Sequence, residues 1–412
     1  MRTDRVIAAM AVNPEEIRSD LQATRPIRRP RGSRATRGLR LALALVVTAS
    51  LSFAGSARAQ FTPFEAAIAE FDAEVARGVA EDAAGCVSVA VFCGDEVIWS
   101  KGYGWADIEN RVACSEETIG RTGSISKSFT AVLMMQLVER GIIGLDDPVE
   151  DYFPEIRNLA DPPADMQPIT FRMLASHTAG LVREPALEGA ASGSIYRWEQ
   201  KVLESIPHTS FKTPPGSEYS YSNIGFGILG LASSRAAGVP FMTLVEEQIF
   251  KPLGMTSSTY IINTPELAAR LSVGYSRDRE TGAVSAEQAT REHFGRGYKV
   301  PNGGIYSTVG DLAKFAAALL GVSPVQILSA ASRAEILTPQ APAESYGLGF
   351  SIQEEEGMKI VGHGGSVAGY NAALAFDLES QIGVAMLRTT SYDPPTGDLL
   401  RVLVAASQGG AE

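Results

Sequence analysis

The stretch TGSISKSFTAVLMMQLVERG, residues 122–141, predicts a helix from Ser124 to about Arg140 that is apolar for most of its length and ends at Gly141. Helix N-termini carry a partial positive charge, so a cation in the first turn is unfavourable. Lys127 nevertheless follows Ser124 by three residues, which places both side chains on the same face of the helix.

That placement has two interpretations. In a dry cleft, burial and nearby positive charge lower the pKa of a lysine, so the amine of Lys127 can accept the proton of the Ser124 hydroxyl. Taken alone, the S-x-x-K spacing also fits a solvated N-cap serine followed by a surface lysine. Two further motifs in the chain favour the first interpretation.

The stretch EYSYSN, residues 218–223, follows the turn-forming KTPPG and places Tyr221 two residues before Asn223. On a turn, this spacing can bring a phenol and an amide side by side. Because phenols titrate near 10, Tyr221 needs positive charge nearby to lower its pKa before it can act as a base at neutral pH. The alternative is a tyrosine that packs beneath the Pro-Gly turn.

The stretch VGHGGSVAGYN, residues 361–371, indicates an apolar strand that ends in His363, two glycines and Ser366. Glycine has no side chain, so a substrate backbone can approach this strand closely at Gly365. The chain has four histidines, and their spacing matches no zinc motif, so we expect neither a metal nor another cofactor.

In this order, S-x-x-K at 124–127, Y-x-N at 221–223 and H-x-G at 363–365 resemble the three landmark motifs of the serine β-lactamase and penicillin-binding-protein superfamily. The tyrosine is similar to that of the class C β-lactamase and D-Ala-D-Ala carboxypeptidase branch. Stretches such as LASHTAGL and GGIYSTVGDLAKF extend the likeness from about residue 65 to 405. The resemblance implies a β-lactamase/transpeptidase-like fold and a serine hydrolase that forms an acyl-enzyme.

The resemblance also implies roles for the motif residues. Ser124 is the acylated nucleophile, and Lys127 and Tyr221 share the proton transfers. Asn223 holds a substrate amide. His363 stands where the family usually has lysine, lining the cleft on the edge strand.

The resemblance also gives the third motif a role for its backbone, and the sequence of this motif differs from that of the family. The N–H groups of Ser124 and Ser366 form the oxyanion hole, where charge develops on the tetrahedral oxygen. His-Gly-Gly replaces Lys-Thr-Gly, so the fixed cation and the hydroxyl that bind a substrate carboxylate are both changed. We therefore expect weak β-lactam hydrolysis and leave ester, amide and D-amino-acid peptide substrates open. The alternative is a penicillin-binding sensor or silent binding protein that acylates without turnover.

The segments around the motifs predict an α+β fold, with a central antiparallel sheet flanked by helices. CVSVAVFC and EVIWSKGYG predict a hairpin, and consecutive short strands are expected from GLGFSIQ to IGVAMLRTT. Helices are expected from Thr62 to Gly78, within STVGDLAKFAAALLG, and from about Asp398 to Ala406.

The middle of the chain is turn-rich, with short helical runs such as ITFRMLASH and FMTLVEEQIF. We therefore assign residues 60–412 to one catalytic domain. Residues 60–144 and 298–412 form its α/β part, and 145–297 form a mainly helical insertion.

The first 59 residues differ from the rest of the chain. We expect residues 1–36, rich in arginine and proline, to be a disordered leader. Residues 37–59 are basic, then apolar, and end in A-x-A, which is typical of a secretory signal peptide cleaved near Ala59-Gln60. The apolar stretch is too short to span a bilayer comfortably, so we favour a periplasmic or secreted protein over a membrane-anchored one.

The charge balance limits the partners. The chain has a net charge of −11, and residues 1–59 hold eleven arginines against four acidic residues, so the remainder is more acidic still. Such a body repels phosphate backbones, which argues against nucleic-acid binding. We expect a small-molecule or peptidoglycan-like peptide substrate, and no stable membrane span after signal cleavage.

The three cysteines leave their pairing open. Cys86 and Cys93 bracket a predicted strand and lie too far apart along it to bond to each other. Cys114 could pair with either of them, and one thiol is left over in both cases.

Overall fold

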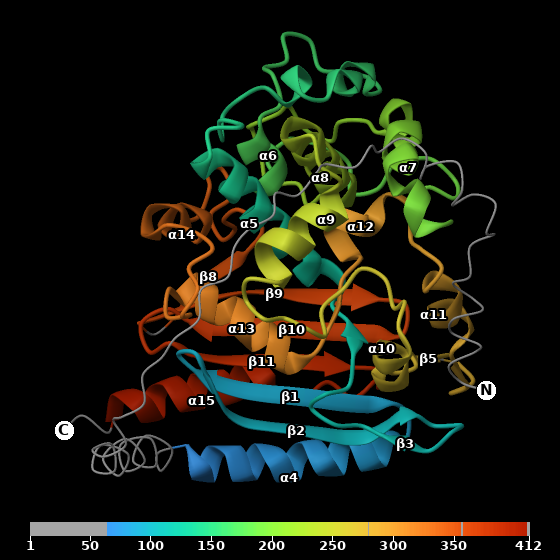
Figure 1. The fold of residues 1–412 in the computed structure, drawn as a ribbon, viewed down its shortest axis with the longest axis vertical. Coiled ribbons are helices and arrows are strands. Elements are labelled where there is room, and N and C mark those ends of the chain that lie inside the picture. The colour runs from blue at the N-terminus through green and yellow to red at the C-terminus, as the bar shows by residue number, and fades with distance from the viewer. Residues whose placement is uncertain (1–63, 279, 356, 410–412) are drawn as a thin grey trace, which may run out of the picture.

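The computed structural model describes residues 64–278, 280–355 and 357–409, and its centre is an antiparallel sheet (Figure 1). The sheet has seven strands in the order β3-β2-β1-β11-β10-β9-β8, and consecutive strands form hairpins as predicted. Their bounds are β1 Cys86–Cys93, β2 Glu96–Asp107, β3 Val112–Ala113, β8 Ser351–Glu355, β9 Met358–Val367, β10 Tyr370–Asp377 and β11 Ile382–Arg388.

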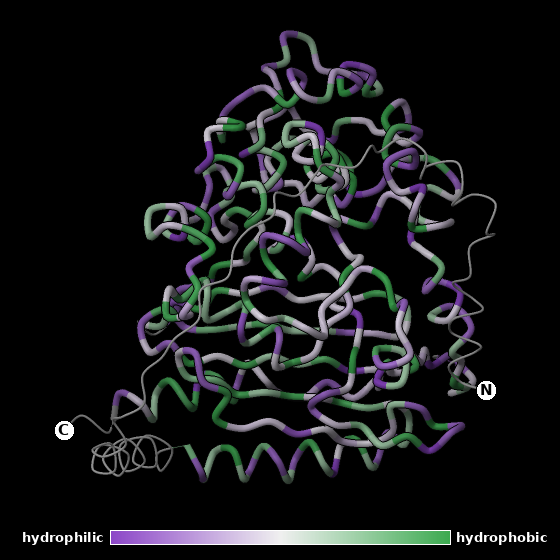
Figure 2. Tube along the Cα trace, in the orientation of Figure 1, coloured by the Kyte–Doolittle hydropathy of each residue, from purple (hydrophilic) through white to green (hydrophobic). Residues whose placement is uncertain are grey.

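Helices cover both faces of this sheet. Helices α4 (Glu65–Asp82) and α15 (Thr396–Gly409) pack on one face, where Val87 and Val89 of β1 point into a shared apolar cluster. Helices α5 (Ser126–Glu139) and α13 (Val309–Leu320) pack on the other face with the larger core. Because strand side chains alternate between faces, each strand supplies both cores. The predicted α+β class is confirmed, and Figure 2 shows apolar and polar segments alternating along α4.

The first described helix runs further than predicted. Residue Gly78 was expected to end it, but α4 continues to Asp82 and has its left-handed cap at Ala83. A Cβ at Gly78 would lie 2.3 Å from Cε2 of Tyr392, so this glycine makes room for a ring that packs on the helix. The predicted start of this helix, at residue 62, lies outside the described residues.

The segment 145–297 consists mainly of short helices, with a hairpin that the sequence analysis did not anticipate. The long helix α8 is buried along most of its length and packs against α5. The hairpin joins β5 (Ser276–Arg277) to β6 (Val284–Ser285). The α-helices here are α6 Phe171–Ala175, α7 Trp198–Ser205, α8 Asn223–Ala237, α9 Phe241–Val245, α10 Pro265–Arg270 and α11 Glu287–Glu292; α12 Val300–Gly303 and α14 Ala330–Ile336 follow the segment.

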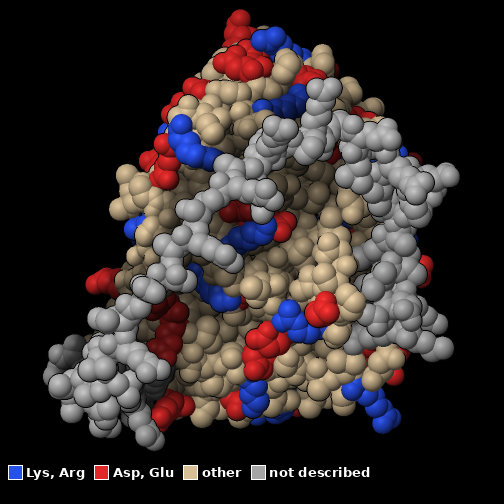
Figure 3. Space-filling model, viewed as in Figure 1, with Lys and Arg blue, Asp and Glu red and all other residues tan. Residues whose placement is uncertain are grey.

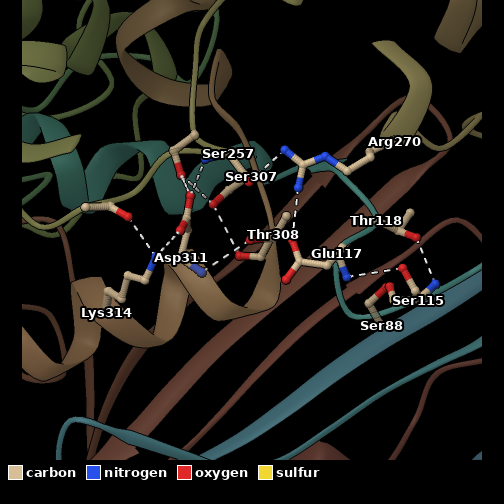
Figure 4. A network of polar contacts seen from close by, with 12 residues as sticks. Ser88, Ser115, Glu117, Thr118, Ser257, Arg270, Ser307, Thr308, Asp311 and Lys314 are labelled. Atoms are coloured by element: carbon tan, nitrogen blue, oxygen red, sulfur yellow. Dashed lines mark hydrogen bonds and ion pairs between the residues drawn. The ribbon is translucent and has the colours of Figure 1, made fainter. Parts of the chain in front are cut away.

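The strand that leads to the 122–141 segment is held from the side. Strand β4 (Gly120–Arg121) pairs with β7 (Tyr306–Ser307), just before α13. Figure 4 shows the polar network beside this pair, in which the Arg270 guanidinium donates to Glu117 Oε2 and Ser257 Oγ, both at 2.9 Å. The segment that precedes Ser124 is therefore held in place by the pairing of β4 with β7 and by the contact between Arg270 and Glu117.

The cysteine thiols are free in the described part of the chain. Cys86 and Cys93 lie at the two ends of β1, as the sequence requires. Cys114 is buried beside Cys86, and the Ser88 hydroxyl lies 3.3 Å from its sulfur.

Residues 1–63, which include the predicted leader and signal peptide, lie outside the described residues. Within the described residues, no single helix is long and apolar enough to cross a membrane; a pair bent by 81°, Asn223–Ala237 with Phe241–Phe250, passes on length and composition only. On the face seen in Figure 3, basic side chains lie among acidic ones.

Candidate active site

Ser124 lies in a turn of 3-10 helix, Gly123–Ile125, directly before α5 begins at Ser126. The predicted helix therefore starts with a tighter turn than expected. Gly123 has a φ of +52°, which only glycine adopts without strain. The Ser124 hydroxyl is half-buried at the mouth of a cleft, and the N–H groups of a first turn have no partner within the helix.

Lys127 is fully buried one turn further on. Its Nζ lies 3.1 Å from Ser124 Oγ, 2.8 Å from Asn223 Oδ1 and 3.3 Å from the Asn302 carbonyl oxygen. The prediction that Lys127 lies within reach of the serine hydroxyl is confirmed. Asn302, on α12, was missed because no local spacing links it to the S-x-x-K motif.

The environment lowers the pKa of Lys127 well below its usual value. Burial is the largest cause, and the positive charge of Arg183 is the next, with smaller effects of the same sign from Lys299 and Arg296. The carboxylate of Glu184 opposes them. A neutral amine is therefore accessible to Lys127 at a pH where an exposed lysine is charged.

Two cations lie close to the Tyr221 ring. The Lys127 ammonium is 4.7 Å from the centre of its ring, and the Arg183 guanidinium is 4.8 Å from it. Burial nevertheless raises the pKa of Tyr221, although a hydrogen bond with Ser124 and the charge of Arg183 oppose the increase. The lowered pKa that Tyr221 would need to act as a base is therefore not found, because loss of hydration outweighs the charge of Arg183, and the phenol is protonated at neutral pH.

Asn223 is buried, and both the oxygen and the nitrogen of its side-chain amide form hydrogen bonds. Its Oδ1 accepts from Lys127, and its Nδ2 donates to Glu184 Oε1 at 2.7 Å. Glu184 also accepts from Lys299 at 3.0 Å and from the Tyr298 hydroxyl. The predicted contact between Asn223 and a substrate amide would require exchange of one of these bonds, so here its amide orients Lys127 instead.

The two glycines of the third motif have different neighbours. A Cβ at Gly365 would lie 1.9 Å from the Thr122 carbonyl oxygen and 3.0 Å from Ser124 N, so the strand itself packs against the serine turn. The side of Gly365 where a Cβ would stand is thus filled by the protein. Gly365 nevertheless lines the cleft together with Gly364 and Ser366, and a Cβ at Gly364 would meet only one oxygen, at 3.9 Å.

His363 does not line the cleft, and this corrects the sequence prediction. Its strand β9 is not the edge, because β8 lies outside it. His363 Nε2 lies 3.0 Å from the Tyr346 hydroxyl and its Nδ1 lies 2.6 Å from the Gly364 carbonyl oxygen. Burial lowers the pKa of His363 to about 3, with a smaller effect from the charge of Lys127. The residue is therefore neutral, and both ring nitrogens are occupied.

His177 is a further buried residue that sequence reasoning passed over. Its Nδ1 accepts a hydrogen bond of 3.0 Å from the Ser222 backbone N–H, within the Y-x-N segment. Its ring centre lies 4.2 Å from that of Tyr221. His177 has a φ of +62°, a strained value for a residue with a side chain. It holds Tyr221 in place, and its position in LASHTAGL was the available signal.

The cleft at Ser124 has a volume of about 590 Å³ and continues along the sheet to the start of α15. Ser124, Arg183 and Tyr221 line its inner end, and Gly364 to Ser366 form one wall. Within the described residues, no group of three or more histidine, cysteine or acidic side chains is arranged to hold a metal.

Ser124, the buried Lys127 and Tyr221 thus lie close together beside strand β9. Comparison with sequence families matches residues 71–408 to the Beta-lactamase family. The chain belongs to this family of serine hydrolases.

Individual relatives agree with that placement. The chain is 28% identical over 322 residues to the D-alanyl-D-alanine-carboxypeptidase/endopeptidase AmpH of Escherichia coli, covering 74% of this chain and 79% of that protein. It is 29% identical to the human Putative beta-lactamase-like 1, covering 76% of this chain and 63% of that protein.

Solved structures show the same fold. The octameric penicillin-binding protein homologue from Pyrococcus abyssi superposes with a TM-score of 0.68 at 26% identity, over 83% of this chain and 77% of that one. The D-amino acid amidase from Ochrobactrum anthropi superposes with a TM-score of 0.69 at 22% identity, over 84% and 100% of the two chains. The predicted β-lactamase/transpeptidase-like fold is confirmed.

Proposed function

We propose that this protein is an exported serine hydrolase that forms an acyl-enzyme on Ser124 and cleaves a carboxylic ester, an amide or a D-amino-acid peptide. The observation that carries the proposal is the set of three contacts made by Lys127. Two of its neighbours, Asn223 Oδ1 and the Asn302 carbonyl oxygen, can only accept hydrogen bonds in this arrangement.

A neutral amine has two N–H donors and one lone pair. If the donors point to the oxygens of Asn223 and Asn302, the lone pair points to Ser124 Oγ at 3.1 Å. Asn223 cannot reverse this pattern, because the Glu184 carboxylate fixes its Nδ2 on the far side. When Lys127 is neutral, the serine hydroxyl therefore donates to it, which is the geometry of a nucleophile and its base.

The first chemical step follows from these contacts. Lys127 Nζ takes the hydroxyl proton while Ser124 Oγ attacks the carbonyl carbon of the substrate. The N–H groups of Ser124 and Ser366, on the facing turn and strand, would stabilise the oxygen that becomes negative. These two segments touch, since a Cβ at Gly123 would lie 2.7 Å from Ser366 N.

The leaving group needs a proton. Tyr221 is protonated and lines the inner end of the cleft with Ser124, so it can give its proton to the leaving atom and regain one from the Lys127 ammonium. In deacylation, water attacks the acyl carbon and its proton passes to Lys127. Lys127 then returns that proton to Ser124 Oγ as the bond between Oγ and the acyl carbon breaks, which releases the carboxylic acid and restores the hydroxyl. The open cleft admits that water.

Export is the part of the proposal that rests on the sequence alone. The basic, apolar and A-x-A order of residues 37–59 supports a signal peptide, with a periplasmic or secreted mature protein. The similarity to a D-alanyl-D-alanine carboxypeptidase/endopeptidase supports a peptide substrate in that compartment. N-terminal sequencing of the secreted protein should give Gln60 as the first residue.

A fluorophosphonate probe tests the hydrolase proposal. The wild-type protein should be labelled at Ser124, and the Ser124→Ala variant should lose the label while keeping its circular dichroism spectrum. Turnover of nitrophenyl esters, nitrocefin and a D-Ala-D-Ala peptide, measured in parallel, ranks the substrate classes. Labelling that persists in Ser124→Ala would contradict the assignment of the nucleophile.

The neutral His363 favours one second candidate, a protein that acylates without turnover. Because His363 carries no charge and does not face the cleft, the carboxylate of a penicillin would find no cation at that position. This candidate predicts a stoichiometric burst followed by no steady state. Sustained turnover of any of the three substrates excludes it.

A further inference from the structure

The cleft holds few cations that could bind an anionic substrate. Lys127 is buried beneath Tyr221 and Ser124, and His363 is neutral and turned away. Among the described residues that line the cleft, the cations are Arg183 and Arg388. The chain as a whole is acidic, with a net charge of −11, so an anionic substrate is held only where a local cation is available.

Arg388 is already engaged. Its guanidinium pairs with Asp393 at 3.0 Å and donates to the backbone oxygens of Thr390 and Tyr392 at 2.8 and 2.9 Å. These contacts close the loop between β11 and α15. An arginine with a carboxylate and two carbonyl partners has little capacity left for a ligand.

Arg183 is different. It is exposed, and it stacks over the Tyr221 ring at 4.8 Å. Within the described chain its side chain forms no ion pair and no hydrogen bond in the structure. Its acidic neighbour in sequence, Glu184, is turned toward Asn223 and Lys299 instead. The guanidinium fork is thus oriented by the aromatic ring and free to bind.

The position of Arg183 indicates which end of a substrate it meets. Tyr221 gives its proton to the leaving atom in the proposed reaction, so the leaving group lies over Tyr221. Arg183 stacks on that ring and lines the same cleft. A carboxylate on the leaving group would therefore reach the guanidinium, whose fork matches the two carboxylate oxygens.

We propose that Arg183 binds a free carboxylate on the leaving group, which makes short D-amino-acid peptides with an uncapped C-terminus the preferred substrate class. The inference rests on the proposed function. Arg183, which follows LASHTAGL in the sequence, would then bind the substrate anion. The strand that carries His-Gly-Gly has no charged side chain at position 363 to do so.

The test compares two substrates that differ in one group, acetyl-D-Ala-D-Ala and its C-terminal carboxamide. We expect the wild-type protein to prefer the free acid in kcat/KM by about tenfold, which corresponds to one charge-assisted hydrogen-bonded pair. In Arg183→Gln the preference should fall to about one, through a higher KM for the acid. Arg183→Lys should give an intermediate ratio, since it keeps the charge and loses the fork.

Arg235→Gln is the matched control. Arg235 is also exposed and its guanidinium also lies 4.8 Å from an aromatic ring, that of Phe153, but outside the cleft. Its substitution removes the same charge and should leave the acid-to-carboxamide ratio unchanged. A ratio that falls equally in both variants would show a general effect of net charge and would overturn the inference.

Binding to the Ser124→Ala variant separates this inference from the hydrolase proposal. Calorimetry with the free acid and the carboxamide should show the same tenfold preference, lost in the Ser124→Ala, Arg183→Gln double variant. If the wild-type protein turns over neither substrate but this preference in binding is present, the hydrolase proposal fails and the anion site stands. If both substrates are hydrolysed and bound equally well, the anion site fails and the hydrolase stands.

Discussion

Lys127 and His363 are two buried basic side chains close to the same cleft, and burial lowers the pKa of both. They differ in what surrounds the nitrogen. Lys127 Nζ has two oxygens that only accept and one serine hydroxyl. His363 has the Tyr346 hydroxyl at one nitrogen and its own neighbour's carbonyl at the other.

The same loss of charge therefore has opposite consequences. In Lys127 the free lone pair faces the nucleophile, so neutrality creates a base. In neutral His363 the lone pair accepts from the Tyr346 hydroxyl and the N–H donates to the Gly364 carbonyl oxygen. The ring therefore only connects strand β9 to the segment that holds Tyr346. Burial sets the protonation state, and the donors and acceptors around the group decide whether it takes part in chemistry.

The largest expected difference between these two residues is in activity. Lys127→Met should lower kcat/KM for any turned-over substrate by about 10³-fold or more, because Ser124 loses its proton acceptor. His363→Gln should lower it by less than about tenfold, since His363 touches neither the nucleophile nor the cleft. Steady-state kinetics of both variants on one ester checks the contrast.

Protein stability must be measured alongside. Lys127→Met leaves Asn223 Oδ1 and the Asn302 carbonyl without their donor, so its unfolding midpoint should also fall. Activity is therefore compared at a temperature where circular dichroism shows both variants to be folded. If both folded variants lost the same amount of activity, the proposed difference between Lys127 as proton acceptor and His363 as a structural contact would be wrong.

The two adjacent glycines of the third motif sharpen the comparison within one strand. Gly365→Ala places a Cβ 1.9 Å from the Thr122 carbonyl oxygen, whereas Gly364→Ala meets its nearest atom at 3.9 Å. We expect the first to destabilise by about 3 kcal/mol, at the upper end of overpacking, and the second by less than about 0.5 kcal/mol. Urea unfolding of the pair measures both values.

The contact between Gly365 and the serine turn should also affect the turnover number. Gly365→Ala pushes the strand away from Ser124 N, so the proposed oxyanion hole widens and kcat should fall more than KM changes. A stable and fully active Gly365→Ala variant would contradict the close contact between strand and turn.

The sequence predicted the parts of this molecule that depend on local spacing. Alternating apolar residues located the strands around β1 and β11, and the i to i+3 spacing of Ser124 and Lys127 was enough to place a hydroxyl beside an amine. The fold class followed, because consecutive hairpins can only build an antiparallel sheet.

The contacts that spacing could not predict join distant segments. Glu184, Asn302, His177 and Tyr346 each fix a motif residue through a hydrogen bond across the interior. The orientation of His363 and the raised pKa of Tyr221 depend on such neighbours and on burial, neither of which one strand or one turn reveals. Spacing therefore predicted the contact between Ser124 and Lys127, while the environments of Tyr221, Asn223 and His363 could not be predicted from it.

Acid stability separates His363 from exposed histidines. Its pKa is about 3 in the folded protein and about 6.5 when unfolded, so below pH 6.5 the unfolded chain binds the extra proton. The free energy of unfolding should then fall as the pH decreases from 6.5 toward 3, by about 1.4 kcal/mol per pH unit from this residue. His363→Gln should flatten the slope by that amount in urea titrations between pH 7 and 4. An unchanged slope would mean that His363 is solvated.

The smallest expected effect concerns the charges around Lys127. The low-pH limb of kcat/KM should report its deprotonation in the free enzyme. Burial is the main reason for the lowered pKa of Lys127, but Arg183 lowers it further and Glu184 raises it. Arg183→Gln removes a positive charge, so the limb should move to higher pH. Glu184→Gln removes a negative charge while keeping an oxygen for Asn223, so the limb should move to lower pH.

The low-pH limb is expected to shift in opposite directions in variants of two adjacent residues, and a general loss of structure would not produce that result. A disturbed site would lower the rate at every pH and leave the limb in place. Arg235→Gln, which changes the net charge at a distance, should also leave it in place. Shifts of the same sign in the Arg183 and Glu184 variants would mean that the limb belongs to another group, such as the substrate, and that Lys127 is not the base that titrates.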